Sequence, residues 1–68
     1  MADPLGNRLR ELREAKGLTQ AQLADLIGVS RKTVNTVENG VFIPSTVVAL
    51  KLAGALDCRV EDLFFLSD

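Results

Sequence analysis

The sequence predicts an all-α fold, a compact bundle of five short helices forming one domain over residues 1–68. Apolar side chains recur at the three- and four-residue spacing of helices, and no segment shows the alternation typical of strands. Glycine and proline divide the chain into short segments, most of them preceded by a capping residue. Because 47% of the 68 residues are hydrophobic, the chain can supply the dense core that so small a domain needs.

The first helix is expected over about residues 4–16. Asp3 is placed as an N-cap before Pro4 at the first helical position, and Gly17 supplies a left-handed stop. Three leucines recur at helical spacing between these ends: Leu5, Leu9 and Leu12.

Two helices joined by a glycine turn follow. Thr19 and Gln22 form a capping box at the start of the second helix, and Gly28 ends it. Ser30 caps a third helix over about residues 30–39. Small and apolar residues lie where two helices that cross at a wide angle must touch. This arrangement is the helix-turn-helix pattern. Its members are Leu23, Ala24, Ile27, Val29, Val34 and Val37.

The last two helices are expected over about residues 45–56 and 60–66. Ser45 caps the fourth helix after Pro44, whereas Arg59 is a poor N-cap for the fifth. The fourth helix is apolar on nearly every side, and the fifth carries more apolar residues than one small core can bury. The resulting excess indicates an interface, for which a homodimer is the favoured interpretation and scattered surface hydrophobes the alternative: Val41, Ile43, Val47, Phe65 and Leu66.

Composition argues against an enzyme and against a metal or other cofactor. The chain has no histidine and only one cysteine, Cys58, which is expected to be packed rather than redox-active. No apolar run is long enough to cross a membrane and no signal peptide is recognisable, so a cytoplasmic protein is expected, nucleoid-associated when bound to DNA. The net charge is −1, but residues 7–40 carry +2 and residues 41–68 carry −2, so one face can approach a polyanion.

Over about residues 7–64 the chain resembles the phage-repressor, or Xre-type, helix-turn-helix regulators. The resemblance rests on seven short motifs: Leu12-Arg13-Glu14, Leu18-Thr19-Gln20, Leu23-Ala24, Gly28-Val29-Ser30-Arg31, Glu38-Asn39-Gly40, Pro44-Ser45 and Glu61-Asp62-Leu63-Phe64. It implies a third helix laid in the major groove of double-stranded DNA, and a two-fold dimer that reads two half-sites. It also implies a largely buried salt bridge between Arg13 and Glu38.

The third helix then carries the candidate base contacts on its outward face: Arg31, Lys32, Thr33, Asn35 and Thr36. Arginine and lysine can bridge O6 and N7 of guanine, and asparagine can pair with adenine. A solvated surface is the alternative. Phosphate contacts are expected from Gln20 and Ser30 at helix starts, where plain capping is the alternative, and the resemblance adds Asn39.

These observations predict a sequence-specific DNA-binding regulator acting as a dimeric repressor. Two alternatives stay open. The apolar C-terminal half could bind a toxin, as in an antitoxin that represses its own operon, or it could pack on the sensor domain of a longer regulator.

Overall fold

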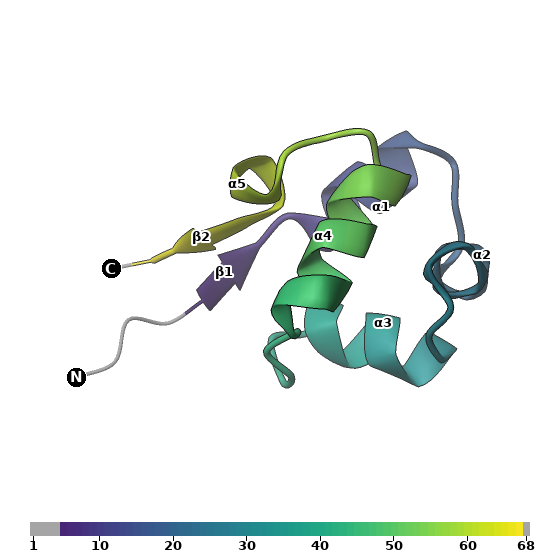
Figure 1. Ribbon diagram of the computed structural model, residues 1–68, viewed down its shortest axis with the longest axis horizontal. Coiled ribbons are helices and arrows are strands. Elements are labelled where there is room, and N and C mark those ends of the chain that lie inside the picture. The colour runs from purple at the N-terminus through teal and green to yellow at the C-terminus, as the bar shows by residue number, and fades with distance from the viewer. Residues whose placement is uncertain (1–4, 68) are drawn as a thin grey trace.

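The computed structural model describes residues 5–67. Within this stretch, five helices and a two-stranded antiparallel sheet succeed one another (Figure 1): β1 Leu5–Asn7, α1 Leu9–Ala15, α2 Gln20–Ile27, α3 Arg31–Glu38, α4 Thr46–Ala55, α5 Val60–Leu63 and β2 Phe64–Leu66. The sheet projects from the side of the helical core opposite α2. None of the helices in this stretch is long and apolar enough to span a lipid bilayer.

The second, third and fourth helices form where their capping residues predict. The Thr19 hydroxyl accepts from the Gln22 N–H at 3.0 Å, and the Gln22 side chain accepts from the Thr19 N–H at 2.8 Å. Ser30 and Ser45 each accept from the backbone N–H three residues further on. Gly28 ends α2 with a φ of 73°, in the left-handed region that glycine tolerates best. These parts of the prediction are confirmed.

The prediction of an all-α fold is wrong at both ends of the described chain. The first helix begins at Leu9 instead of residue 4, and Leu5–Asn7 is a strand; the expected cap at Asp3 and Pro4 lies outside the described residues. The fifth helix ends at Leu63 instead of residue 66, and Phe64–Leu66 is the partner strand. The register pairs Leu5 with Leu66, Gly6 with Phe65 and Asn7 with Phe64.

Packing of an aromatic ring on a glycine explains why these residues pair. The Phe65 ring covers Gly6, and a Cβ added to Gly6 would lie 2.4 Å from Phe65 Cε2. A ring laid over a cross-strand glycine covers backbone that the glycine leaves bare. The guanidinium of Arg8 lies 5.9 Å from the centre of the same ring, within reach of a cation–π contact. Gly6 therefore belongs to a strand rather than to the opening turn of a helix.

Asn7 connects β1, α1 and α3. Its Oδ1 accepts from the Leu9 N–H at 3.0 Å, which satisfies a free donor at the start of α1. Its Nδ2 donates to the Val37 carbonyl at 3.0 Å. The start of α1 is thereby attached to the last turn of α3.

The hydrophobic core lies where α1, α2, α3, α4 and α5 meet. Its fully buried side chains come from every one of these helices: Leu9, Leu23, Val34, Val37, Leu52 and Leu63. Of the four consecutive apolar residues 63–66, Leu63 and Phe64 are buried, whereas Phe65 and Leu66 are exposed. Arg59 offers no acceptor to α5, and Asp62 compensates by accepting from the Arg59 N–H at 3.0 Å.

Candidate nucleic-acid interface

Helices α2 and α3 form a rigid pair that points one face of α3 outward. Ala24 is buried in α2, and its carbonyl accepts from the Val29 N–H at 3.0 Å across the glycine turn. Val34 and Val37 are each 1% exposed and fix the inner face of α3 in the core. The opposite face of α3 is therefore held at a defined angle to the rest of the domain.

The start of α3 presents two cations that have no salt-bridge partner in the described part of the chain. Arg31 and Lys32 are both exposed, and no carboxylate among residues 5–67 forms a salt bridge with either of them. Both side chains can therefore reach an anion or a base edge without breaking an internal contact.

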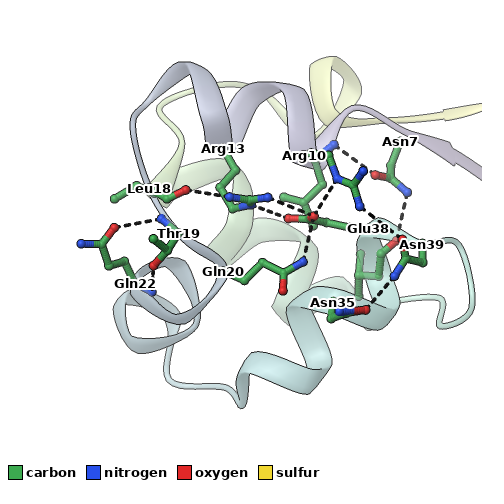
Figure 2. Close-up of polar contacts among 12 residues, drawn as sticks. Asn7, Arg10, Arg13, Leu18, Thr19, Gln20, Gln22, Asn35, Glu38 and Asn39 are labelled. Carbon is green, nitrogen blue, oxygen red and sulfur yellow. Dashed lines mark hydrogen bonds and ion pairs between the residues drawn. The ribbon is translucent and has the colours of Figure 1, made fainter.

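The other three candidate base contacts are half-buried and hydrogen-bonded within the protein. The Thr33 hydroxyl pairs with the Ser30 hydroxyl at 2.9 Å. The Thr36 hydroxyl donates to the carbonyls of Lys32 and Thr33, at 3.0 and 3.1 Å. Asn35 Oδ1 accepts from Asn39 at 2.6 Å, so part of its accepting capacity is already used within the protein (Figure 2).

The three candidate phosphate contacts differ in the hydrogen bonds that they already make within the protein. Gln20 donates one side-chain N–H to Glu38 at 3.1 Å, and its backbone N–H lies at the start of α2. Ser30 caps α3 through its hydroxyl. Asn39 is exposed at the far end of α3 and accepts from Arg10 Nη2 at 3.5 Å.

Glu38 is the centre of a polar network that joins α1, α2 and α3 (Figure 2). Arg13 Nε lies 2.6 Å from Oε2 and Arg13 Nη2 lies 3.3 Å from Oε1, while Arg13 Nη1 donates to the Leu18 carbonyl at 2.7 Å. The Glu38 side chain is 0% exposed and that of Arg13 11%. The structure thus brings together the two residues that the resemblance pairs.

The network explains how a carboxylate stays charged inside the protein. Burial by itself would raise the pKa of Glu38, but hydrogen bonds from Arg13, Gln20 and Arg10, with the positive charge of Arg13, bring it below its ordinary value. The hydrogen bond to Glu38 raises the pKa of Arg13 despite its burial. The acidic end of α3 is therefore covered by arginine and does not face an approaching polyanion as a bare charge.

Arg10 is a member of this network that the sequence analysis did not identify. Its Nε lies 3.4 Å from Glu38 Oε1, and its guanidinium also reaches Asn39. Its position three residues before Arg13 places it on the same face of α1, which is the only signal of this role in the sequence. The role of Asn7 in joining α1 to α3 was not predicted either, because its partner Val37 is distant in the chain.

The five residues expected at a dimer interface are all exposed, but they do not form one patch. Ile43 lines an apolar groove of about 560 Å³ together with Leu50 of α4, and Val47 lies exposed on α4. Val41 instead lines a smaller groove beside α3. Phe65 and Leu66 belong to the β1–β2 ribbon, and the ring of Phe65 is partly occupied in covering Gly6.

Cys58 and Gly54 lie near the end of α4. Cys58 is half-buried against the core, and burial, followed by the charges of Asp62 and Asp57, raises the pKa of its thiol. A thiol with a raised pKa is less reactive, which fits a packing role. Gly54 is exposed, and apart from its chain neighbours and the backbone of its own helix no atom of residues 5–67 lies within 4 Å of the place where its Cβ would be.

A helix-turn-helix whose second helix presents free cations on a rigid outer face defines a DNA-binding transcriptional regulator. Residues 9–63 match the helix-turn-helix family HTH_3, and the chain belongs to this family, whose members are DNA-binding regulators and not enzymes.

Individual relatives agree with this class. The chain is 39% identical over 62 residues to YgzD of Bacillus subtilis, an uncharacterised HTH-type transcriptional regulator, covering 91% of this chain and 94% of YgzD. It is 36% identical over 64 residues to the competence pilus inhibition repressor of Acinetobacter baylyi, covering 94% of this chain but 58% of the repressor. The crystal structure of the restriction-modification controller protein C.AhdI from Aeromonas hydrophila superposes with a TM-score of 0.77 at 53% identity, over 81% of this chain and 83% of that one.

Proposed function

We propose that this protein is a dimeric repressor that reads an inverted repeat through the major groove of double-stranded DNA. The observation that carries the proposal is the asymmetry of α3. Its first residues are the free cations Arg31 and Lys32, whereas its one acidic residue, Glu38, is buried under arginine. An α-helix fits the major groove, and the N-terminal residues of a recognition helix contact the base edges there.

The candidate base contacts have different roles in this proposal. Arg31 and Lys32 read guanine, since each can reach O6 and N7 without giving up an internal partner. Asn35 reads adenine with its side-chain amide, whose oxygen already accepts one hydrogen bond from Asn39. Thr33 and Thr36 approach the bases mainly with their methyl groups, because both hydroxyls already have partners within the protein.

Phosphate groups would hold α2 and α3 in register on the duplex. Both helices have eight residues and begin at capped ends, where backbone N–H groups and the positive pole of the helix attract anions. Gln20 contributes its backbone N–H, Ser30 its place at the start of α3, and Asn39 its side chain at the far end. Such contacts fix orientation and carry no sequence information.

A dimer would form through the apolar surface around α4. This surface is defined by Ile43, Val47 and Leu50, which are between 59% and 72% exposed. Burial of exposed apolar side chains of this size against a second copy is favourable, at about 25 cal/mol per Å². A two-fold dimer places two recognition helices on half-sites one helical turn apart. Repression follows from occupying a promoter, and a repressor is among the relatives.

Selection of bound duplexes from a random DNA library tests this function. An enriched inverted repeat with half-sites one helical turn apart is expected. An Arg31→Ala variant should relax the preference at one or two base pairs per half-site, at a cost of about 1–3 kcal/mol for the correct base. Arg59→Ala is the matched control, because Arg59 is an exposed arginine at the start of α5, outside the helix-turn-helix, and should leave the preference unchanged. No enrichment, with binding that vanishes at physiological salt, would contradict the proposal.

The same apolar surface supports a second candidate, a protein partner other than a second copy, such as a toxin or a sensor domain. The groove between α4, α5 and β1 would accept an apolar segment of that partner. A monomer in solution that co-purifies with an unrelated protein would favour this candidate over the homodimer.

A further inference from the structure

A chain of hydrogen bonds runs from the buried Glu38 carboxylate, through Arg10 and Asn39, to Asn35 (Figure 2). Arg10 Nε donates to Glu38 Oε1 at 3.4 Å, and Arg10 Nη2 donates to Asn39 Oδ1 at 3.5 Å. Asn39 Nδ2 in turn donates to Asn35 Oδ1 at 2.6 Å. An arginine of α1 is thereby connected to a candidate base contact of α3.

Arg10 sets the direction of this chain. A guanidinium carries donors and no acceptor, so the Asn39 amide must face it with Oδ1. The opposite orientation would place the N–H groups of Asn39 against a positive charge. With its oxygen turned to Arg10, Asn39 has its nitrogen toward Asn35, and Asn35 must present Oδ1 to it. Each of the two amides is therefore held in one of its two orientations.

Glu38 fixes Arg10 in place without depending on it. The carboxylate also accepts from Arg13, at a shortest distance of 2.6 Å, and from Gln20 at 3.1 Å. The side chain of Arg10 is 59% exposed, whereas that of Arg13 is 11% exposed. Replacement of Arg10 thus leaves the buried charge with its main partner, so the effect of Arg10 on Asn39 can be measured in a folded protein.

We infer that Arg10 is a positioning residue for base recognition: through Asn39 it fixes the orientation in which the Asn35 amide meets the DNA. Asn35 Oδ1 is turned toward Asn39, and Asn35 Nδ2, which donates to no group among residues 5–67, is left for a base edge. This orientation favours guanine, whose N7 and O6 accept, over cytosine, whose N4 donates, and it remains compatible with N7 of adenine. The inference rests on the proposed function and adds to it a residue outside the helix-turn-helix.

The test uses the operator obtained by selection and compares its affinity with guanine and with cytosine placed at the position that Asn35 reads. That position is the one in each half-site where Asn35→Ala removes the base preference. The wild type should favour guanine by at least about five-fold, the lower end of what one good side-chain contact supplies. Arg10→Ala should bring this ratio toward one. An amide that turns freely has the matching orientation about half of the time, which weakens binding of guanine about two-fold and strengthens that of cytosine.

Matched variants separate positioning from a general loss of charge. Arg8→Ala removes an exposed arginine at the start of α1 that lies over the Phe65 ring, and it should leave the ratio unchanged. Arg10→Lys keeps a cation that only donates and should retain most of the preference. In an Asn35→Ala background, Arg10→Ala should not change the ratio, because the amide that it orients is absent. Thermal melting of each variant checks the fold.

Asn39→Asp tests the next link of the chain and decides the question even if Arg10→Ala does not fold. Aspartate accepts from Arg10 but has no N–H to donate, so Asn35 should turn its nitrogen toward the carboxylate and its oxygen toward the DNA. The added negative charge weakens binding to every sequence alike. The ratio of the two affinities should invert in favour of cytosine.

Failure of the inference is distinguishable from failure of the proposed function. If an operator is selected but Arg10→Ala gives the same ratio as Arg8→Ala, the positioning role is overturned and the DNA-binding function stands. The same holds if Asn39→Asp still prefers guanine, or if Asn35→Ala removes the preference at no position. If no operator is enriched, both fall together.

Discussion

The ring of Phe65 lies over Gly6, its cross-strand partner, so closely that the smallest side chain at residue 6 would overlap it. The contact joins the first described strand to the last, and the guanidinium of Arg8 lies 5.9 Å from the centre of the same ring. It also explains why the expected first helix over about residues 4–16 was wrong at its start: Gly6 lies in β1, where the Phe65 ring leaves no room for a side chain.

Gly6→Ala should destabilise the fold by about 1 kcal/mol, because the added methyl group forces the half-exposed Phe65 ring to move. The free energy of urea unfolding measures the effect. In a Phe65→Ala background the same substitution should cost much less, giving a coupling energy of at least about 0.5 kcal/mol. Equal costs in the two backgrounds would show that the ring does not constrain residue 6.

Arg13→Ala should lower the free energy of unfolding by about 3–5 kcal/mol, because it removes the main partner of a fully buried carboxylate. The exposed pair of Arg59 and Asp62 provides the control, and Arg59→Ala should change stability by no more than about 0.5 kcal/mol. If Arg13→Ala is too unstable to purify, Arg13→Lys can replace it, because lysine keeps the charge without the bidentate contact. Its loss in the free energy of unfolding is expected to lie between those of Arg13→Ala and Arg59→Ala. Similar values for Arg13→Ala and Arg59→Ala would contradict the role given to the network.

Acid should unfold the protein through Glu38. Its pKa in the folded protein is lowered from an ordinary value of about 4.3, so the unfolded chain takes up a proton more readily. The stabilisation by the ionised carboxylate is complete above about pH 5 and is lost as the pH falls through the folded-state pKa. Melting temperatures across this range should fall more steeply for the wild type than for Glu38→Gln. Parallel curves for the two proteins would assign acid unfolding to other groups.

Leu50→Glu should weaken self-association, because it places a charge on the apolar surface around α4. Leu26→Glu is a matched control, since Leu26 is 63% exposed on α2 and Leu50 is 59% exposed on α4. Sedimentation equilibrium should show a dimer for the wild type and Leu26→Glu, and a monomer for Leu50→Glu at the same concentration. A dimer that survives Leu50→Glu would place the interface elsewhere.

The parts of the fold that the sequence predicted well are those set by local contacts. The caps at Thr19, Ser30 and Ser45 act within three residues of the chain, and Gly28 ends α2 by its own conformational freedom. The helix-turn-helix pair follows from these signals and from the buried apolar positions between them.

The parts that the sequence did not predict depend on partners distant in the chain. The ribbon needs Gly6 to meet Phe65, and neither three-residue strand shows a period of its own. At the candidate interface, exposure of Arg31 and Lys32 agrees with what their positions suggest. The internal hydrogen bonds of Gln20 and Asn35 become evident only when α1, α2 and α3 are assembled around Glu38.

Pairing of Leu5 with Leu66 also has a consequence for the order of folding. Closing a loop that spans almost the whole chain has a high entropic cost, whereas the helices and their neighbours close short loops. The ribbon is therefore expected to form after the helical core and to open before it. Amide hydrogens of β1 and β2 should exchange with solvent by local opening, while those of α2 and α3 exchange only when the whole domain unfolds.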